Sequence, residues 1–210
     1  MILYTKKENN EFIFVVKWEM ICMNIVEQVK DYVLKQTELY KNTSSDNYDF
    51  WNEHIKYVYK ESIDLAKAYN ADIEIVSLGA LLHDMALVNK VGDRKNHHIN
   101  GEKIAKEVLE SFNYDNEKTS RVLKCVYNHR SSKNSESIEE TCVADADILA
   151  HFDNLPMLFN SAFVRNNVSL NEVRDWMREA FEKDYNDLSE KTKENFKARY
   201  QQISEIVLGK

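Results

Sequence analysis

The sequence predicts an all-α fold, a bundle of helices, on three observations. Glycine and proline number only 4 and 1 in 210 residues, so the chain is poor in the residues that form tight turns. From residue 24 onward, apolar residues recur three or four positions apart, the period of a helix with one buried face. A hydrophobic content of 43% over this length is enough for one sizeable core. We therefore predict a single helical domain over residues 23–210.

Residues 1–22 differ from the rest of the chain. Their two apolar stretches, 2–5 and 12–16, flank a polar stretch and could form a short β-ribbon, which alone would be marginally stable. We treat these residues as an N-terminal extension of unknown role.

Polar breaks and capping residues mark the helices within the predicted domain. The helix predicted over 73 to about 87 is apolar nearly all round, so we expect it at the centre of the core. The patterns Ser137-x-x-Glu140 and Ser169-x-x-Glu172 have the form of capping boxes and predict the starts of two later helices. The other helices are predicted over 24–40, from the break at 42–47 to 69, from 97, from 116 and over 196–207.

Composition restricts the class of partner. The formal net charge of −7 argues against binding to nucleic-acid polymers or anionic membranes, although a small anionic substrate stays compatible with local cations in a pocket. No stretch is long and apolar enough for a transmembrane helix. Three cysteines without CxxC spacing suit a reducing compartment and give no thiolate zinc site. We expect a cytoplasmic protein. The apolar stripe from Trp176 to Leu188 could be core or the surface of a homodimer.

The pair His83-Asp84 closes an apolar run that begins at Ile73. A carboxylate at the end of such a run is partly desolvated and needs partners. Either a hydrogen-bond network or a metal ion would supply them.

Other residues could complete a metal site. Four of the six histidines fall on or at the start of separate helices, and two aspartates join them: His54, His83, His98, His129, Asp84 and Asp147. A mixed histidine and carboxylate set suits a divalent ion such as Mn, Fe, Co, Ni, Zn or Mg, and ligands on different helices can converge in a bundle. A single histidine on an apolar face is nevertheless more often a hydrogen-bonded core residue than a ligand. Spacing alone therefore leaves both explanations open, and it assigns no role to His97 or His151.

The ordered set resembles the signature of the HD-domain metal-dependent phosphohydrolases. Three stretches carry the resemblance: residues 50–58 (FWNEHIKYV), 78–84 (LGALLHD) and 144–149 (ADADIL). The resemblance implies a helical HD-type bundle in which His54, His83, Asp84 and Asp147 bind a metal, with Asp147 rather than Asp145 as the last ligand. It covers about 49–152 well and the C-terminal helices only loosely.

Two further histidines resemble the extra ligands of HD proteins that hold two metals. His98 and His129 would bind the second ion, Asp84 would bridge the two ions, and His97 replaces His98 if the register slips by one. The loop after His129 lacks the Gly-Tyr-Pro element of cyclic-di-GMP phosphodiesterases, which argues against that activity.

The resemblance implies hydrolysis of a small phosphorylated molecule, with a nucleotide as the favoured substrate. A bound metal lowers the pKa of a water and polarises a phosphoryl oxygen. His83 and Asp84 would be the catalytic pair, and Arg94, Lys95 and Arg130, in loops beside ligand positions, are candidates for binding phosphate. Two alternatives use the same fold: a di-iron oxygenase, which shares the ligand set, and a non-catalytic nucleotide-binding module.

Overall fold

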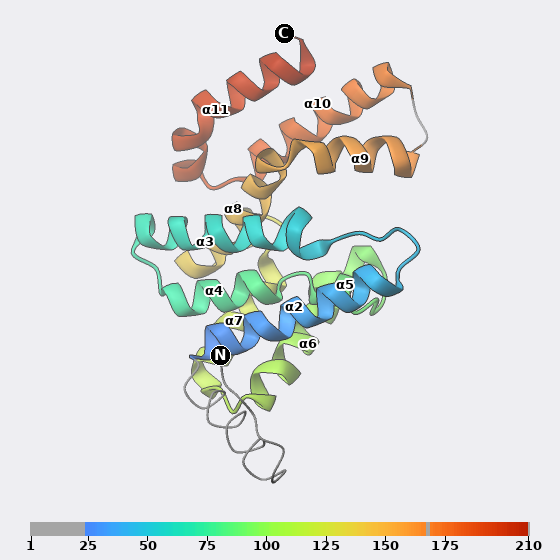
Figure 1. Ribbon diagram of the computed structural model, residues 1–210. Coiled ribbons are helices and arrows are strands. Elements are labelled where there is room, and N and C mark those ends of the chain that lie inside the picture. The colour runs from blue at the N-terminus through green and yellow to red at the C-terminus, as the bar shows by residue number, and fades with distance from the viewer. Residues whose placement is uncertain (1–23, 167–168, 210) are drawn as a thin grey trace, which may run out of the picture.

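A computed structural model describes residues 24–166 and 169–209, and within those ranges every regular element is a helix (Figure 1). The predicted ribbon and extension at residues 1–22 lie outside the described residues. The helices are α2 (Ile25–Thr43), α3 (Lys56–Tyr69), α4 (Ile73–Leu82), α5 (Met85–Val88), α6 (His97–Ser111), α7 (Asn116–Asn128), α8 (Ile138–Asp153), α9 (Leu155–Asn166), α10 (Leu170–Asp187) and α11 (Glu190–Leu208). Short 3-10 or π turns occur at η1 (Trp51–Ile55), η2 (Arg94–Asn96) and η3 (Ser132–Asn134).

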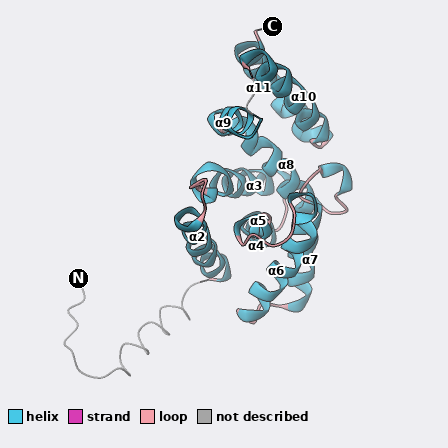
Figure 2. Ribbon diagram, turned by 90° about the vertical axis from the view of Figure 1, so that its right-hand side faces the viewer, coloured by secondary structure: helices cyan, strands magenta, loops and turns pink. Residues whose placement is uncertain are grey.

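The helices form two tiers. In Figure 1, α2 to α8 make up the larger tier, and α9, α10 and α11 lie together on one side of it. Turning the molecule shows α4 and α5 in the middle, with α2, α3, α6, α7 and α8 around them (Figure 2). Helix α8 connects the tiers because it packs against α3 and also precedes α9.

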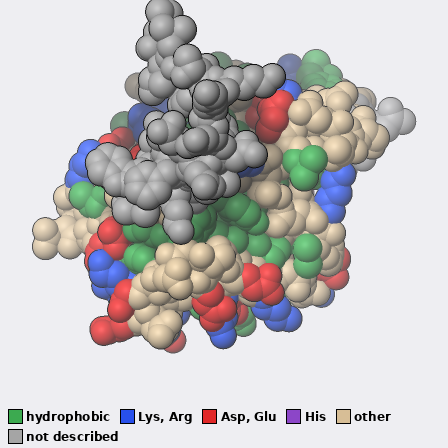
Figure 3. Space-filling view, turned by 60° about the horizontal axis from the view of Figure 1, so that its bottom comes forward, with side chains coloured by type: hydrophobic (Ala, Val, Ile, Leu, Met, Phe, Trp, Pro, Cys, Tyr) green, Lys and Arg blue, Asp and Glu red, His purple; other side chains and the backbone are tan. Residues whose placement is uncertain are grey.

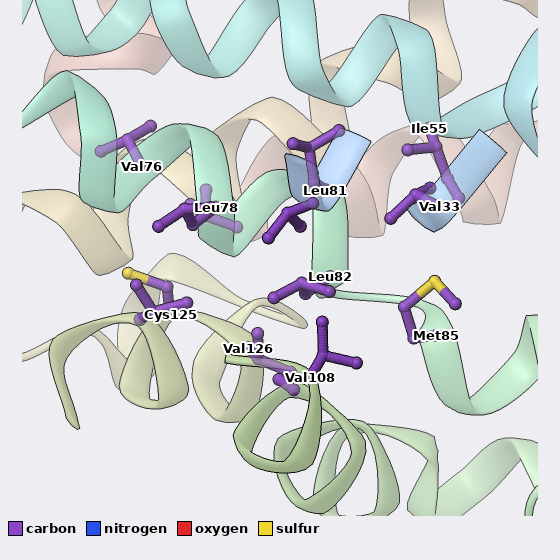
Figure 4. Packing of buried hydrophobic residues seen from close by; sticks show 14 of the residues in the cluster. Val33, Ile55, Val76, Leu78, Leu81, Leu82, Met85, Val108, Cys125 and Val126 are labelled. Carbon is purple, nitrogen blue, oxygen red and sulfur yellow. The ribbon is translucent and has the colours of Figure 1, made fainter. Parts of the chain in front are cut away.

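Helix α4 is the centre of the main core, as its composition predicts. Every residue from 75 to 82 is buried, and Figure 4 shows Leu78, Leu81 and Leu82 among apolar side chains of the surrounding helices. Its start is fixed by Asp72, whose carboxylate accepts hydrogen bonds from two backbone amides of the first turn. At Gly79 the helix approaches α7 so closely that a Cβ would lie 2.7 Å from the Cβ of Cys125.

The prediction of one continuous helix over 73–87 is wrong at its functional end. Helix α4 ends at Leu82, and α5 begins at Met85. Asp84 leaves the helical conformation, with φ −105° and ψ 14°, and its carbonyl accepts the amide hydrogens of Leu87 and Val88. Neither glycine nor proline occurs at this break, so the sequence gives no local signal for it.

The predicted capping boxes both begin helices. Ser137 caps α8 by accepting from the amide of Glu140, and at α10 both reciprocal bonds between Ser169 and Glu172 are present. Pro156 is the second residue of α9, where its missing N–H leaves no intrahelical bond unmade.

The apolar stripe of α10 contributes to the core, although Trp176 is only partly buried. Val173, Met177 and Phe181 are fully buried. The rings of Phe181 on α10 and Phe196 on α11 each lie 5.0 Å from the ring of Phe152 on α8. These contacts hold the C-terminal tier to α8.

The surface carries both signs of charge. On the part of the face visible in Figure 3, basic and acidic side chains lie side by side around the edge. Among the described residues, no helix combines the length and the apolar composition needed to cross a membrane.

A buried aspartate ties α8 to the start of α11. The Asp145 carboxylate accepts hydrogen bonds from the amide of Ser189 at 2.9 Å and from the hydroxyl groups of Ser189 at 2.5 Å and Thr192 at 2.6 Å. Its side chain is fully buried, so these bonds replace its hydration. Asp145 therefore anchors the C-terminal tier.

We expect Asp145→Ala to lower the free energy of unfolding by about 3 kcal/mol, because it leaves buried donors without their charged acceptor. Urea unfolding followed by circular dichroism measures this change. The control is Asp175→Ala, which removes an exposed carboxylate of α10 that pairs with Arg178 at the surface and should change stability by less than about 0.5 kcal/mol. Equal stability of the two variants would contradict the anchoring role.

Candidate metal centre

Five elements deliver polar side chains to one buried cluster. The side chains are those of His54 in the π turn η1, His83 and Asp84 at the break between α4 and α5, His97 at the start of α6, His129 at the end of α7, and Asp147 in α8. A π turn inserts an extra residue into a helix and often marks a functional site.

One half of the cluster surrounds Oδ2 of Asp84. This oxygen lies 3.6 Å from Nε2 of His54 and 3.6 Å from Nε2 of His83. The two imidazole nitrogens are 3.1 Å apart, and Oδ1 of Asp147 lies 3.0 Å from His54 Nε2 and 3.7 Å from His83 Nε2. Two nitrogens and two carboxylate oxygens thus converge on one small volume.

The other half surrounds Oδ1 of the same carboxylate. This oxygen lies 3.2 Å from Nε2 of His97 and 3.9 Å from Nε2 of His129. These two nitrogens are 2.9 Å apart. Each oxygen of Asp84 therefore faces its own pair of imidazoles, as a carboxylate that bridges two cations would.

The spacing of the imidazoles fits metal ligands. Nitrogen ligands bound at about 2.1 Å and at right angles to one another lie about 3.0 Å apart. Both observed Nε2 to Nε2 distances, 3.1 and 2.9 Å, are close to this value. A hydrogen bond would explain each distance only if one ring of each pair carried its proton on Nε2.

Backbone hydrogen bonds place the proton on the other ring nitrogen in three of the four histidines. Nδ1 of His83 donates to the carbonyl of Ala80 at 2.7 Å, and Nδ1 of His129 donates to that of Val126 at 2.6 Å. Nδ1 of His97 likewise lies 2.7 Å from the carbonyl of residue 94. When such a ring is neutral, its Nε2 carries no proton and points its lone pair into the cluster. Metal binding requires this arrangement.

Electrostatics keep Asp84, Asp147 and His129 in their binding forms. Burial alone would raise the pKa of the Asp84 carboxyl, but the imidazoles of His83 and His97 outweigh it and hold this pKa well below its usual range. The pKa of Asp147 is lowered in the same way, with His54 as the main opposing partner. Burial lowers the pKa of His129 to about 4, so its ring is neutral at neutral pH.

The structure puts His97, not His98, in the cluster. The ring of His98 instead contacts Tyr127, with centroids 5.4 Å apart, and borders a separate cavity. The reason is the register of α6: His97 precedes Gly101 by one turn, and both belong to the buried face. The apolar spacing of that face was the signal available in the sequence.

The three residues predicted to bind phosphate lie in different places in the structure. Arg94 borders the cavity over His54 and Asp84. Lys95 is exposed, and its carbonyl accepts a hydrogen bond from Nη1 of Arg130 at 3.1 Å. Arg130 borders the cavity next to His98 instead. Only Arg94 is therefore placed to contact a molecule at the cluster.

Sequence reasoning missed His151. It stands one turn after Asp147 on α8, stacks on His54 with centroids 5.7 Å apart, and pairs through Nδ1 with Oδ2 of Asp184 at 2.9 Å. Burial lowers its pKa, but the bond to Asp184 outweighs this and raises the pKa to about 9. The four-residue spacing from Asp147 was a signal, whereas the partner on α10 was not foreseeable.

The metal content of two variants shows whether His97 or His98 is a ligand. We expect His97→Ala to lose the ion on its side of Asp84 and to retain the other, while His98→Ala keeps the wild-type content. Elemental analysis of protein dialysed after loading with manganese measures this. A loss confined to His98→Ala would show that the register given above is wrong.

Comparison with known proteins places this cluster in a family. The family model of the HD domain matches residues 52–151. The fold is similar to that of an HD-superfamily hydrolase from Bacillus thuringiensis, with 20% identity and a TM-score of 0.62 over 87% of this chain and 92% of that one. A predicted HD superfamily hydrolase from an uncultured Thermotogales bacterium gives 21% identity and a TM-score of 0.49 over 61% of this chain and 75% of that one. No curated protein matches the chain. With His54, His83-Asp84 and Asp147 in the order and place of the HD motif, residues 52–151 of this chain are an HD domain.

Proposed function

We propose that this protein is a metal-dependent hydrolase that cleaves a phosphate ester of a small molecule, with a nucleotide as the favoured substrate. The observation that carries the proposal is the Asp84 carboxylate, whose two oxygens each face a separate pair of imidazoles. The HD domain and the shared fold support a hydrolase at the level of the superfamily.

The donor set suits divalent ions that accept both nitrogen and carboxylate ligands, such as Mn, Fe, Co, Ni or Zn. When bound, such ions supply a water acidic enough to ionise at neutral pH and polarise a phosphoryl oxygen. His54, His83 and Asp147 would hold one ion, His97 and His129 the other, and Asp84 both.

The protein's own residues shape the space above the cluster. A small chamber of 50 Å³ lies over His54 and Asp84, and Arg94 and His151 form part of its wall. The Arg94 guanidinium can bind a phosphoryl group in this chamber through two parallel hydrogen bonds. Phe50 borders the same chamber.

Loss of the bridging carboxylate should abolish the activity. We expect Asp84→Ala, and separately His83→Ala, to reduce phosphate release from a panel of nucleotides and sugar phosphates by at least about a thousandfold. Chelation should inactivate the wild type, and added divalent metal should restore it. Turnover that survives in chelated Asp84→Ala would rule the proposal out. A bound di-iron centre with oxygen consumption and no phosphate release would favour the oxygenase alternative.

Adjacent cations allow a matched test of phosphate binding. We expect Arg94→Ala to lower kcat/KM roughly tenfold to hundredfold, because a hydrogen bond to a charged group is lost. Lys95→Ala changes the same formal charge one residue away and should stay within about twofold of the wild type. Equal effects of the two substitutions would show that kcat/KM depends only on the positive charge near the site and not on a contact from Arg94.

A further inference from the structure

The chamber over the cluster of histidines and aspartates adjoins a second, larger cavity. Both spaces share four wall residues, Arg94, His151, Met157 and Ser161. The larger one has a volume of 440 Å³ and lies between α8, α9 and α10, so its remaining wall comes from the C-terminal tier, beyond residue 151 where the HD match ends.

The inner chamber is the size of a single phosphoryl group. Since about 10–15 Å³ of such volume holds one water, its 50 Å³ accommodates about four water-sized groups, as many as the oxygens of one phosphate. His151 cannot turn freely within it, because Nδ1 is held by Asp184 at 2.9 Å.

The outer cavity suits an uncharged ring system rather than further phosphates. Its apolar wall is made by Met157, Leu158, Trp176 and Ala180. Its one lysine, Lys183, is already paired with Asp187 at 3.0 Å. Asp184 is paired with His151 at 2.9 Å, and Glu179 adds a negative charge that would repel a second or third phosphate.

We infer that the substrate is a phosphate monoester with one base-sized aromatic group, a nucleoside monophosphate in chemical class. Its phosphoryl group occupies the inner chamber at Arg94, and its base lies in the outer cavity against Trp176. The cavity volume falls within the range of small-molecule sites, and an indole offers the flat apolar surface on which a base stacks. This inference rests on the proposed phosphohydrolase function, and Trp176 is its specificity-determining residue.

A panel of phosphate esters tests the inferred class of substrate. Phosphate release by the metal-loaded wild type is measured with nucleoside 5′-mono-, di- and triphosphates and with glycerol 2-phosphate, which has no ring. We expect kcat/KM to be highest for the monophosphates. A preference for triphosphates, or equal use of glycerol 2-phosphate, would overturn the inference.

Variants of α10 test whether Trp176 determines the specificity. We expect Trp176→Ala to lower the ratio of kcat/KM for the nucleoside monophosphate to that for glycerol 2-phosphate roughly tenfold to hundredfold, chiefly through KM. Trp176→Phe keeps an aromatic face and should restore most of the ratio. Leu170→Ala, at the exposed start of the same helix, should leave it at the wild-type value. An unchanged ratio in Trp176→Ala would remove Trp176 from the site.

Direct binding separates failure of this inference from failure of the proposed function. Tight binding of a nucleoside monophosphate by calorimetry, weakened in Trp176→Ala but without phosphate release by the wild type, would contradict the hydrolase and retain the cavity assignment. Phosphate release without any effect of Trp176 on binding or on the substrate ratio would retain the hydrolase and reject the cavity assignment.

Discussion

The buried carboxylate of Asp84 is the constraint on which the rest of the structure depends. Only 6% of the residue is exposed, and it follows helix α4, whose residues 75 to 82 are all buried. A charge in that position is too costly without partners, and four imidazoles from four separate elements provide them. The break between α4 and α5 turns the carboxylate toward these rings. Backbone carbonyls in the preceding turns then orient most of the rings by binding Nδ1.

Two aspartates of α8, Asp145 and Asp147, show how the tiers are connected. They lie two residues apart and therefore point to different sides of the helix. Asp145 binds the first turn of α11 and holds the C-terminal tier, whereas Asp147 faces His54 in the cluster. One turn further on, His151 reaches Asp184 of α10. The C-terminal helices are thus fixed to the same helix that supplies the cluster, and their cavity opens beside it.

Much of this could be predicted from the sequence, for physical reasons. Apolar periodicity and scarce glycine predict the helices, and the capping boxes at Ser137 and Ser169 mark two starts correctly. The break at His83-Asp84 escaped prediction because its cause is tertiary: the partners of Asp84 come from distant segments. His98 was preferred to His97 because adjacent residues differ by only 100° on a helix, and motif spacing does not settle that difference. The pair of His151 and Asp184 joins residues 33 positions apart, which no local pattern encodes.

The most direct test of the account is a crystal structure of the protein loaded with manganese, with the ions located by their anomalous scattering. We expect an ion on each side of Asp84, one bound by Nε2 of His54 and His83 and the other by Nε2 of His97 and His129, at bond lengths of about 2.1–2.2 Å. A single peak that involves only one oxygen of Asp84, or an ion bound by His98, would contradict it.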